Sequence, residues 1–249
     1  SIASCSRNVF DSIYDSTGRI TTRPCRSPHS CPLCTPQWLA KKSSQLSKCL
    51  KSIDSDKRSA YMITLTLPFP DRDSLAERYN SLSNTWSRLM QSSHVKRLRR
   101  DLDLSYVRVF EETFEKGRFN PHIHAFFIAN KSKHTSDFVY STTDVWSKVA
   151  NGIGLPARAN NQSVDVIKTE DYKHFSEYPT KQRYVDFSFD AHNWKDSPPI
   201  RPFQLLQATI AQGDATLLEH WHEYEMATLR LRRFSYSRDL TRYFKKRKL

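Results

Sequence analysis

Two histidines one residue apart, His122 and His124, are the first candidates for chemistry in this sequence. They lie within residues 119–127, a run whose alternation predicts a β-strand. Alternate side chains of a strand point to the same face, so the two imidazoles would lie side by side. Such a pair could bind a metal ion, whereas two polar residues on the wet face of a half-buried strand are the alternative.

A second predicted strand, residues 106–114, would supply a carboxylate to this pair. It is joined to the first by residues 115–118, a short connection containing Gly117 that suits a hairpin. Glu111 and Glu112 would point to opposite faces, so only one of them can lie beside the histidines. Two imidazoles and a carboxylate favour Mn²⁺ or Mg²⁺, with phosphate oxygens and water completing the ligand shell.

With these motifs in view, the chain resembles the rolling-circle replication initiators (Rep proteins) of small plasmids. These are members of the HUH endonuclease superfamily, and the likeness is to the single-tyrosine type with N-terminal zinc-binding cysteines. It is carried, in family order, by residues 61–68, 110–113 with 121–124, 178–181 and 232–238. The alignment of the second motif favours Glu111 over Glu112 as the third metal ligand.

The resemblance implies that Tyr178 is the catalytic nucleophile and that Lys181 offsets the negative charge developing on the phosphate. Spacing alone would not choose among eleven tyrosines, and Tyr172 and Tyr184 are the fallback candidates.

His174 stands where single-tyrosine relatives commonly carry a glutamate thought to activate water at termination. A neutral imidazole can also act as a general base near pH 7, so the role could survive the change. The alternative is a carboxylate from Glu170, Asp171 or Glu177.

A cluster of cysteines near the N-terminus predicts a second metal site. Cys31 and Cys34 form a C-x₂-C pair, Cys25 precedes them by six residues, and Cys5 occupies a position similar to the family's first cysteine. Four thiolates would close a structural Zn²⁺ site, although His29 could replace Cys5. Redox chemistry of the pair is disfavoured because no thioredoxin-like pattern surrounds it, and Cys49 is expected to stay a free thiol.

The charge balance favours a nucleic-acid partner. Lysine and arginine total 39 against 26 acidic residues, a formal net charge of +13. The residues expected to contact DNA form one basic run and part of a C-terminal motif: Lys96, Arg97, Arg99, Arg100, Arg232, Arg233 and Arg238. The tail after residue 241 also mixes aromatic and basic residues, which could stack on bases or remain a solvated end.

The pattern of elements predicts an α+β fold with a central antiparallel sheet that carries the His-x-His site, is covered by helices, and follows an N-terminal zinc-binding segment. We expect residues 1–55 to form that segment with a helix, and residues 56–249 the endonuclease domain with a C-terminal helix and basic tail. The expected strands are 60–67, 106–114, 119–127 and 163–168, and the expected helical stretches are 36–53, 74–92, 141–149, 171–177 and 205–231. Residues 186–203 read as a loop that could form a flap.

Several classes of protein are disfavoured. Only five glycines are present, and no Gly-rich phosphate loop of an ATPase or dinucleotide-binding protein occurs. No run of about twenty apolar residues or signal peptide is found, so we expect no membrane association and a cytoplasmic location in a plasmid or phage host.

The resemblance thus implies metal-dependent DNA nicking and strand transfer through a covalent 5′-phosphotyrosine, with release of a 3′-OH primer. The partners would be single-stranded or hairpin DNA at a replication origin and, by resemblance, a host helicase and polymerase. The alternatives are an HUH transposase or relaxase of a mobile element, and a non-catalytic zinc-containing DNA-binding regulator.

Overall fold

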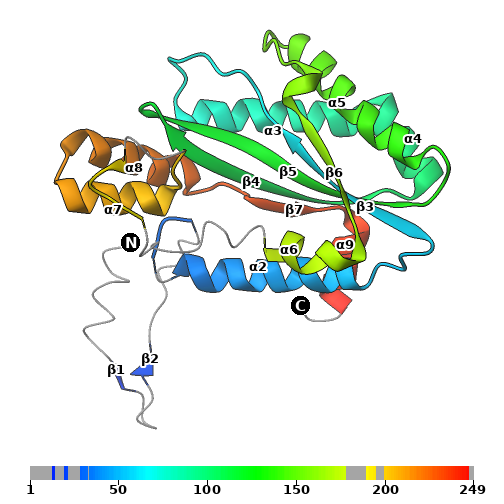
Figure 1. The fold of residues 1–249 in the computed structure, drawn as a ribbon, viewed down its shortest axis with the longest axis horizontal. Coiled ribbons are helices and arrows are strands. Elements are labelled where there is room, and N and C mark those ends of the chain that lie inside the picture. Colours follow the sequence, from blue (N-terminus) through cyan, green and yellow to red (C-terminus); the bar gives the residue numbers. More distant parts are fainter. Residues whose placement is uncertain are drawn as a thin grey trace. The chain divides into compact units, whose positions relative to one another are not determined.

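A computed structural model describes residues 13–14, 20–21, 29–32, 34–177, 189–194 and 199–246 (Figure 1). The chain divides into two compact units. The first takes its described residues from within 1–43, 114–118 and 179–231, and the second from within 44–113, 119–178 and 232–249. The expected boundary near residue 55 stays a prediction.

The second unit contains a five-stranded antiparallel sheet with the strand order β6-β3-β5-β4-β7. Its strands are β3 (Arg58–Leu65), β4 (Ser105–Glu115), β5 (Arg118–Asn130), β6 (Ser163–Ile167) and β7 (Phe234–Tyr236). Branched and aromatic residues are common in β4 and β5, and most residues of β3, β4 and β5 are buried, as expected of strands between helices. The predicted antiparallel sheet with the His-x-His pair on one of its strands is confirmed.

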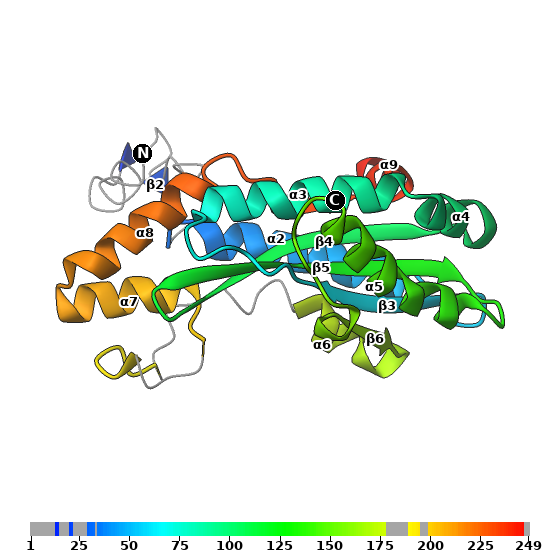
Figure 2. The same ribbon diagram turned by 90° about the horizontal axis from the view of Figure 1, so that it is seen from above.

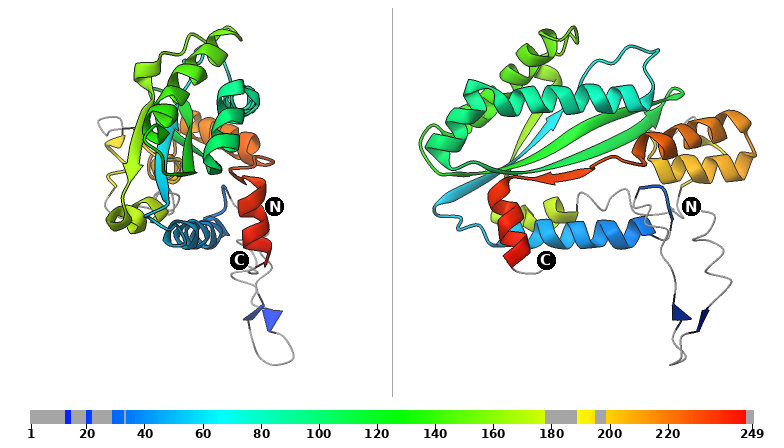
Figure 3. Two further views of the ribbon diagram at one scale, coloured as in Figure 1. Left: turned by 90° about the vertical axis from the view of Figure 1, so that its right-hand side faces the viewer. Right: turned by 180° about the vertical axis from the view of Figure 1, so that it is seen from behind.

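Helices cover both faces of this sheet. Figures 1 and 2 show α3 (Leu75–Gln91), α4 (Ser93–Leu102) and α5 (Thr135–Asn151) on one face. The short helix α6 (Tyr172–Glu177) and α9 (Arg238–Lys246) lie on the other face, as the two views of Figure 3 also show. Two 3₁₀ turns, Ala159–Asn161 and Thr169–Asp171, flank β6. The sheet therefore has two distinct protein-covered sides.

The helix predicted over 74–92 is confirmed as α3, and its start has a clear local cause. The Ser74 side chain accepts a hydrogen bond from the Glu77 backbone N–H, and the Glu77 carboxylate accepts one from the Ser74 backbone N–H. This capping box satisfies two donors that the first turn would otherwise leave unpaired. Leucines and aromatic rings at helical spacing then face the sheet: Leu75, Tyr79, Leu82, Trp86 and Leu89.

The hairpin between β4 and β5 turns through two residues with positive φ, Lys116 at 52° and Gly117 at 73°. Positive φ at both central positions is the type I′ geometry, whose twist matches that of the flanking strands. Gly117 adopts this conformation at low cost. The predicted short hairpin is thus confirmed.

The first unit contains a helical hairpin made of α7 (Pro202–Gln212) and α8 (Ala215–Thr228). The expectation of one helical stretch from 205 to 231 is wrong, because Gly213 ends α7 with φ of 62° and the Asp214 side chain caps α8. The helix α2 (Cys34–Lys51) corresponds to the one predicted over 36–53, and it buries Leu39, Leu46 and Leu50. The short strands β1 (Ile13–Tyr14) and β2 (Ile20–Thr21) pair near the N-terminus.

Candidate metal centre

The two adjacent glutamates of β4 have different environments. Glu112 is fully buried on the face that α3 covers: the Tyr79 hydroxyl donates to its Oε2 and Arg233 Nη2 donates to its Oε1, each at 2.6 Å. Because side chains alternate along a strand, Glu111 points to the opposite face. The prediction that only one of the pair could lie beside the histidines is confirmed.

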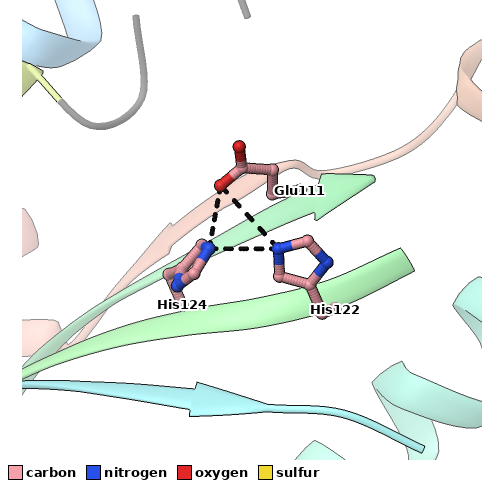
Figure 4. A group of neighbouring side chains, drawn as sticks. All are labelled: Glu111, His122 and His124. Carbon is pink, nitrogen blue, oxygen red and sulfur yellow. Dashed lines mark hydrogen bonds and ion pairs between the residues drawn. The ribbon is translucent and has the colours of Figure 1, made fainter. Parts of the chain in front are cut away.

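Glu111, His122 and His124 bring three ligand atoms together (Figure 4). Glu111 Oε2 lies 2.8 Å from His124 Nε2 and 3.9 Å from His122 Nε2, and the two Nε2 atoms are 3.1 Å apart. All three atoms lie within 4.8 Å of one another; the His124 side chain is buried, and those of Glu111 and His122 are partly exposed. Within the described ranges no other set of three His, Cys, Asp or Glu side chains converges in this way.

The other ring nitrogens are held on the outer side of this cluster. His122 Nδ1 lies 3.3 Å from the Asn120 carbonyl oxygen, and His124 Nδ1 lies 3.0 Å from Thr64 Oγ1. A carbonyl only accepts hydrogen bonds, so the bond to Asn120 places the His122 proton on Nδ1 and leaves the Nε2 lone pair facing the cluster. This is the tautomer that a metal-binding imidazole requires.

Electrostatics favour an uncharged His122 ring. Burial lowers the pKa of His122 below its ordinary value, and the neighbouring His124 acts in the same direction. The Glu111 carboxylate and the Asn120 carbonyl oppose this lowering of the pKa. A neutral imidazole can donate its lone pair, so the donor chemistry of the cluster fits a divalent cation and leaves ligand positions for phosphate oxygens or water.

The predicted nucleophile Tyr178 and its neighbour Lys181 lie outside the described residues, as does the fallback Tyr184. The helix α6 ends at Glu177, one residue before Tyr178, and lies on the sheet face to which Glu111 points (Figure 1). On this helix Tyr172 is buried, whereas His174 is exposed and contacts the Phe175 ring.

Of the predicted zinc ligands, Cys5 and Cys25 lie outside the described residues. Cys31 is buried, and Cys34, partly exposed, begins α2. His29 Nε2 lies 3.0 Å from the Leu231 carbonyl oxygen, so His29 could ligate a metal only through Nδ1. The zinc ligands therefore stay a prediction.

Cys49 is a free thiol in the described structure, and its burial raises its pKa to about 12.

The predicted DNA contacts differ in their exposure. On α4, Val95, Leu98 and Leu102 are buried, and the four basic residues lie exposed around the rest of the helix: Lys96, Arg97, Arg99 and Arg100. Arg232 and Arg238 are exposed as well. Arg233 is buried against Glu112, so its guanidinium holds β7 to β4 and is not on the surface.

Comparison with known proteins gives the class to which this fold and site belong. A family model described as "Replication protein" (Rep_1) matches residues 19–171, which is more than half of the chain. The chain therefore belongs to this replication protein family, and the likeness drawn from its motifs to rolling-circle plasmid initiators is confirmed at that level.

One similar protein is "Protein rep" of Staphylococcus aureus, which is 29% identical over 119 residues. That match covers 47% of this chain and 50% of the relative, so the chain spans about half the length of the curated protein it matches. In addition, none of the helices in the described ranges is long and apolar enough to cross a bilayer.

The sequence does not predict three side-chain contacts of the strands that carry the candidate centre. Thr64 contacts a histidine of the candidate centre, while on the opposite face Tyr79 donates a hydrogen bond to Glu112 and Arg233 forms an ion pair with it. Thr64 lies within the first resemblance motif, but the motif alone does not say which side chain it meets. That partner depends on the register between β3 and β5.

Proposed function

We propose that this replication protein nicks single-stranded or hairpin DNA at an origin and starts rolling-circle replication from the 3′-OH that it releases. The observation that carries the proposal is the convergence of Glu111, His122 and His124 on one face of the sheet in a chain of this family. The convergence of these three ligand atoms favours a metal-dependent enzyme over a DNA-binding regulator without catalysis.

In this proposal the two imidazoles and the carboxylate hold one divalent cation, Mn²⁺ or Mg²⁺. The cation, when bound, polarises the non-bridging oxygens of a phosphodiester and orients the phosphorus for attack. Glu111 contributes a single negative charge and the neutral rings contribute none. The ligands therefore leave the site with a net positive charge that attracts a phosphate.

Tyr178 is the proposed nucleophile. Its phenolic oxygen would form a bond to phosphorus while the bond from phosphorus to the 3′ oxygen breaks, and the departing oxygen takes up a proton to become the 3′-OH. The position of Tyr178 in sequence, directly after α6, supports this assignment because α6 lies on the face of the candidate centre. Lys181 would offset negative charge on the phosphoryl oxygens.

His174 is the proposed base for the later step in which water releases the covalent DNA. Its exposure on α6 leaves its ring accessible to water and to DNA. A host helicase and polymerase would extend the new primer, as the family resemblance implies.

The basic face of α4 is proposed to bind DNA outside the cleavage site. The helix lies on the sheet face opposite to the one that carries Glu111 (Figure 1). Lys96 and Arg97 would contact the backbone of flanking DNA through charge, with little dependence on sequence. Arg232 and Arg238 are the further proposed contacts.

The N-terminal cysteines are proposed to hold a structural Zn²⁺ within residues 1–55, and residues 56–249 to form the endonuclease domain. A thiolate site of this kind would contribute to the folding stability of that segment.

The test is covalent capture. The protein is incubated with labelled stem-loop oligonucleotides and Mn²⁺, and any protein–DNA adduct is mapped by mass spectrometry. An adduct on Tyr178 that EDTA abolishes and Tyr178→Phe removes is the expected result. An adduct on Tyr172 or Tyr184 would move the nucleophile, and tight binding without any adduct would contradict the proposed reaction.

A further inference from the structure

Thr64 lies beside the candidate centre on the neighbouring strand. The register of β3 and β5 places Thr64 directly opposite His124, and Thr64 Oγ1 lies 3.0 Å from His124 Nδ1. On its other side, β3 pairs with β6, where Ser163 stands opposite Thr64. Thr64 is therefore fixed on a strand with neighbours on both sides, and its branched side chain has few rotamers open to it.

The contact has a chemical consequence for His124. A hydroxyl can donate or accept a hydrogen bond, so the bond to Thr64 survives in either tautomer of the ring. Only the tautomer with the proton on Nδ1 leaves the Nε2 lone pair available to a cation. In that tautomer the His124 N–H donates and Thr64 Oγ1 accepts.

We infer that Thr64 is a positioning residue that orients the His124 ring and, when a cation is bound at Nε2, accepts the hydrogen bond from the Nδ1–H of that ring. The inference rests on the proposed function of the Glu111, His122 and His124 cluster. It differs from the case of His122, whose outer nitrogen meets a backbone carbonyl that no substitution of a side chain removes. Thr64 is therefore the outer hydrogen-bond partner of this centre whose role can be tested by substituting a side chain.

The contact between Thr64 and His124 would give the motif in residues 61–68 a role in positioning a metal ligand. Thr66 stands two residues further along the chain, but its hydroxyl lies 3.3 Å from the Asn161 carbonyl oxygen and not beside a histidine. The hydroxyls of the two threonines therefore have different hydrogen-bond partners. Thr66→Val is a matched control, since it removes a hydroxyl from the same segment of chain.

The expected loss of metal affinity can be estimated from metal sites in other proteins. Loss of the outer partner of a metal-binding histidine typically weakens metal affinity about 10- to 100-fold. Thr64→Val keeps the shape of the side chain and removes the acceptor, so its Mn²⁺ affinity is expected to fall within that range. Thr64→Ser keeps the hydroxyl and is expected to bind nearly as the unaltered protein does.

The experiment is calorimetric titration of the full chain with Mn²⁺ in the absence of DNA. It compares the unaltered protein with Thr64→Val, Thr64→Ser and Thr66→Val, and adds Glu111→Gln as a ligand variant. Weak binding by Thr64→Val alone among the threonine variants supports the inference. Equal affinity of Thr64→Val and the unaltered protein, with Glu111→Gln weakened, overturns it while the metal centre stands.

If the unaltered protein binds no Mn²⁺, or if Glu111→Gln binds Mn²⁺ as tightly as the unaltered protein does, the metal centre is refuted, and the proposed role of Thr64 is refuted with it.

A second measurement needs no variant at position 64. Imidazole ¹⁵N spectra with Mg²⁺ are expected to show His124 protonated at Nδ1, and a proton on Nε2 would overturn the inference even if Thr64→Val failed to fold.

Discussion

Replacing Glu112 by Gln should destabilise the protein far more than the same change at Glu111. The Glu112 carboxylate is fully buried and receives one hydrogen bond on each oxygen, from Tyr79 and from the Arg233 guanidinium. An amide has one oxygen and one NH₂ group, so in the variant one of these two donors would face another donor. The variant also leaves the buried arginine without its countercharge.

The burial of the Glu112–Arg233 ion pair sets the size of the expected loss in the free energy of unfolding. Removing one partner of a buried ion pair typically costs about 3–5 kcal/mol, because the remaining charge is left uncompensated. For a chain of this size that corresponds to a fall of roughly 6–20 °C in the thermal midpoint. Tyr79→Phe, which removes one hydrogen bond to the carboxylate, should cost less, about 1.5–3 kcal/mol.

Thermal and urea unfolding of the purified variants measure these effects. Glu111→Gln is the matched control, since it makes the same chemical change one residue away on the other face of β4. The double variant Glu112→Leu with Arg233→Met removes both charges and is expected to lose less stability than Glu112→Gln. A Glu112→Gln protein as stable as Glu111→Gln would refute the assigned environments of the two glutamates.

Three further outcomes are expected. His124→Asn should abolish stoichiometric Mn²⁺ binding in calorimetry without unfolding the protein, and retained affinity would exclude His124 as a ligand. Replacing Lys96 and Arg97 together by Gln should lower the salt dependence of DNA binding. The slope of log K against log salt concentration should fall in magnitude by about one for each cation that no longer pairs with a phosphate. An unchanged slope would show that α4 is not part of the DNA-binding surface. The raised pKa of Cys49, about 12 against an ordinary 9.0, keeps its thiol protonated at pH 9, so iodoacetamide should label Cys49 slowly in the native state and fast in urea. Equal labelling rates in the two states at pH 9 would contradict its burial.

Much of the second unit could be predicted because its pattern is local. Alternation in residues 106–127 places Glu111 and Glu112 on opposite faces, and the family resemblance of the second motif favours Glu111 as the residue beside the histidines, so this choice needed no structure. By contrast, apolar residues lie on both sides of Gly213, where a left-handed conformation ends α7 and the Asp214 cap begins α8. A continuous helix was therefore predicted where a helical hairpin occurs.

The contacts around the candidate centre are less local. Thr64 and His124 are separated by 60 residues, and their pairing depends on the register of two strands that no short motif specifies. Arg233 looks like a surface cation within a basic motif, but Glu112 draws its guanidinium into the interior. Whether a charged side chain is free to contact DNA therefore depends on partners that are distant in the sequence, as Glu112 is from Arg233.

The central claim is that Glu111, His122 and His124 form a catalytic metal centre for DNA cleavage. The most direct measurement is cleavage of a labelled stem-loop pool with Mn²⁺ by the unaltered protein, by Glu111→Gln, and by Glu115→Gln as a control from the same strand. We expect cleavage by the unaltered protein and by Glu115→Gln, and none by Glu111→Gln. Cleavage by Glu111→Gln at the rate of the unaltered protein would contradict it.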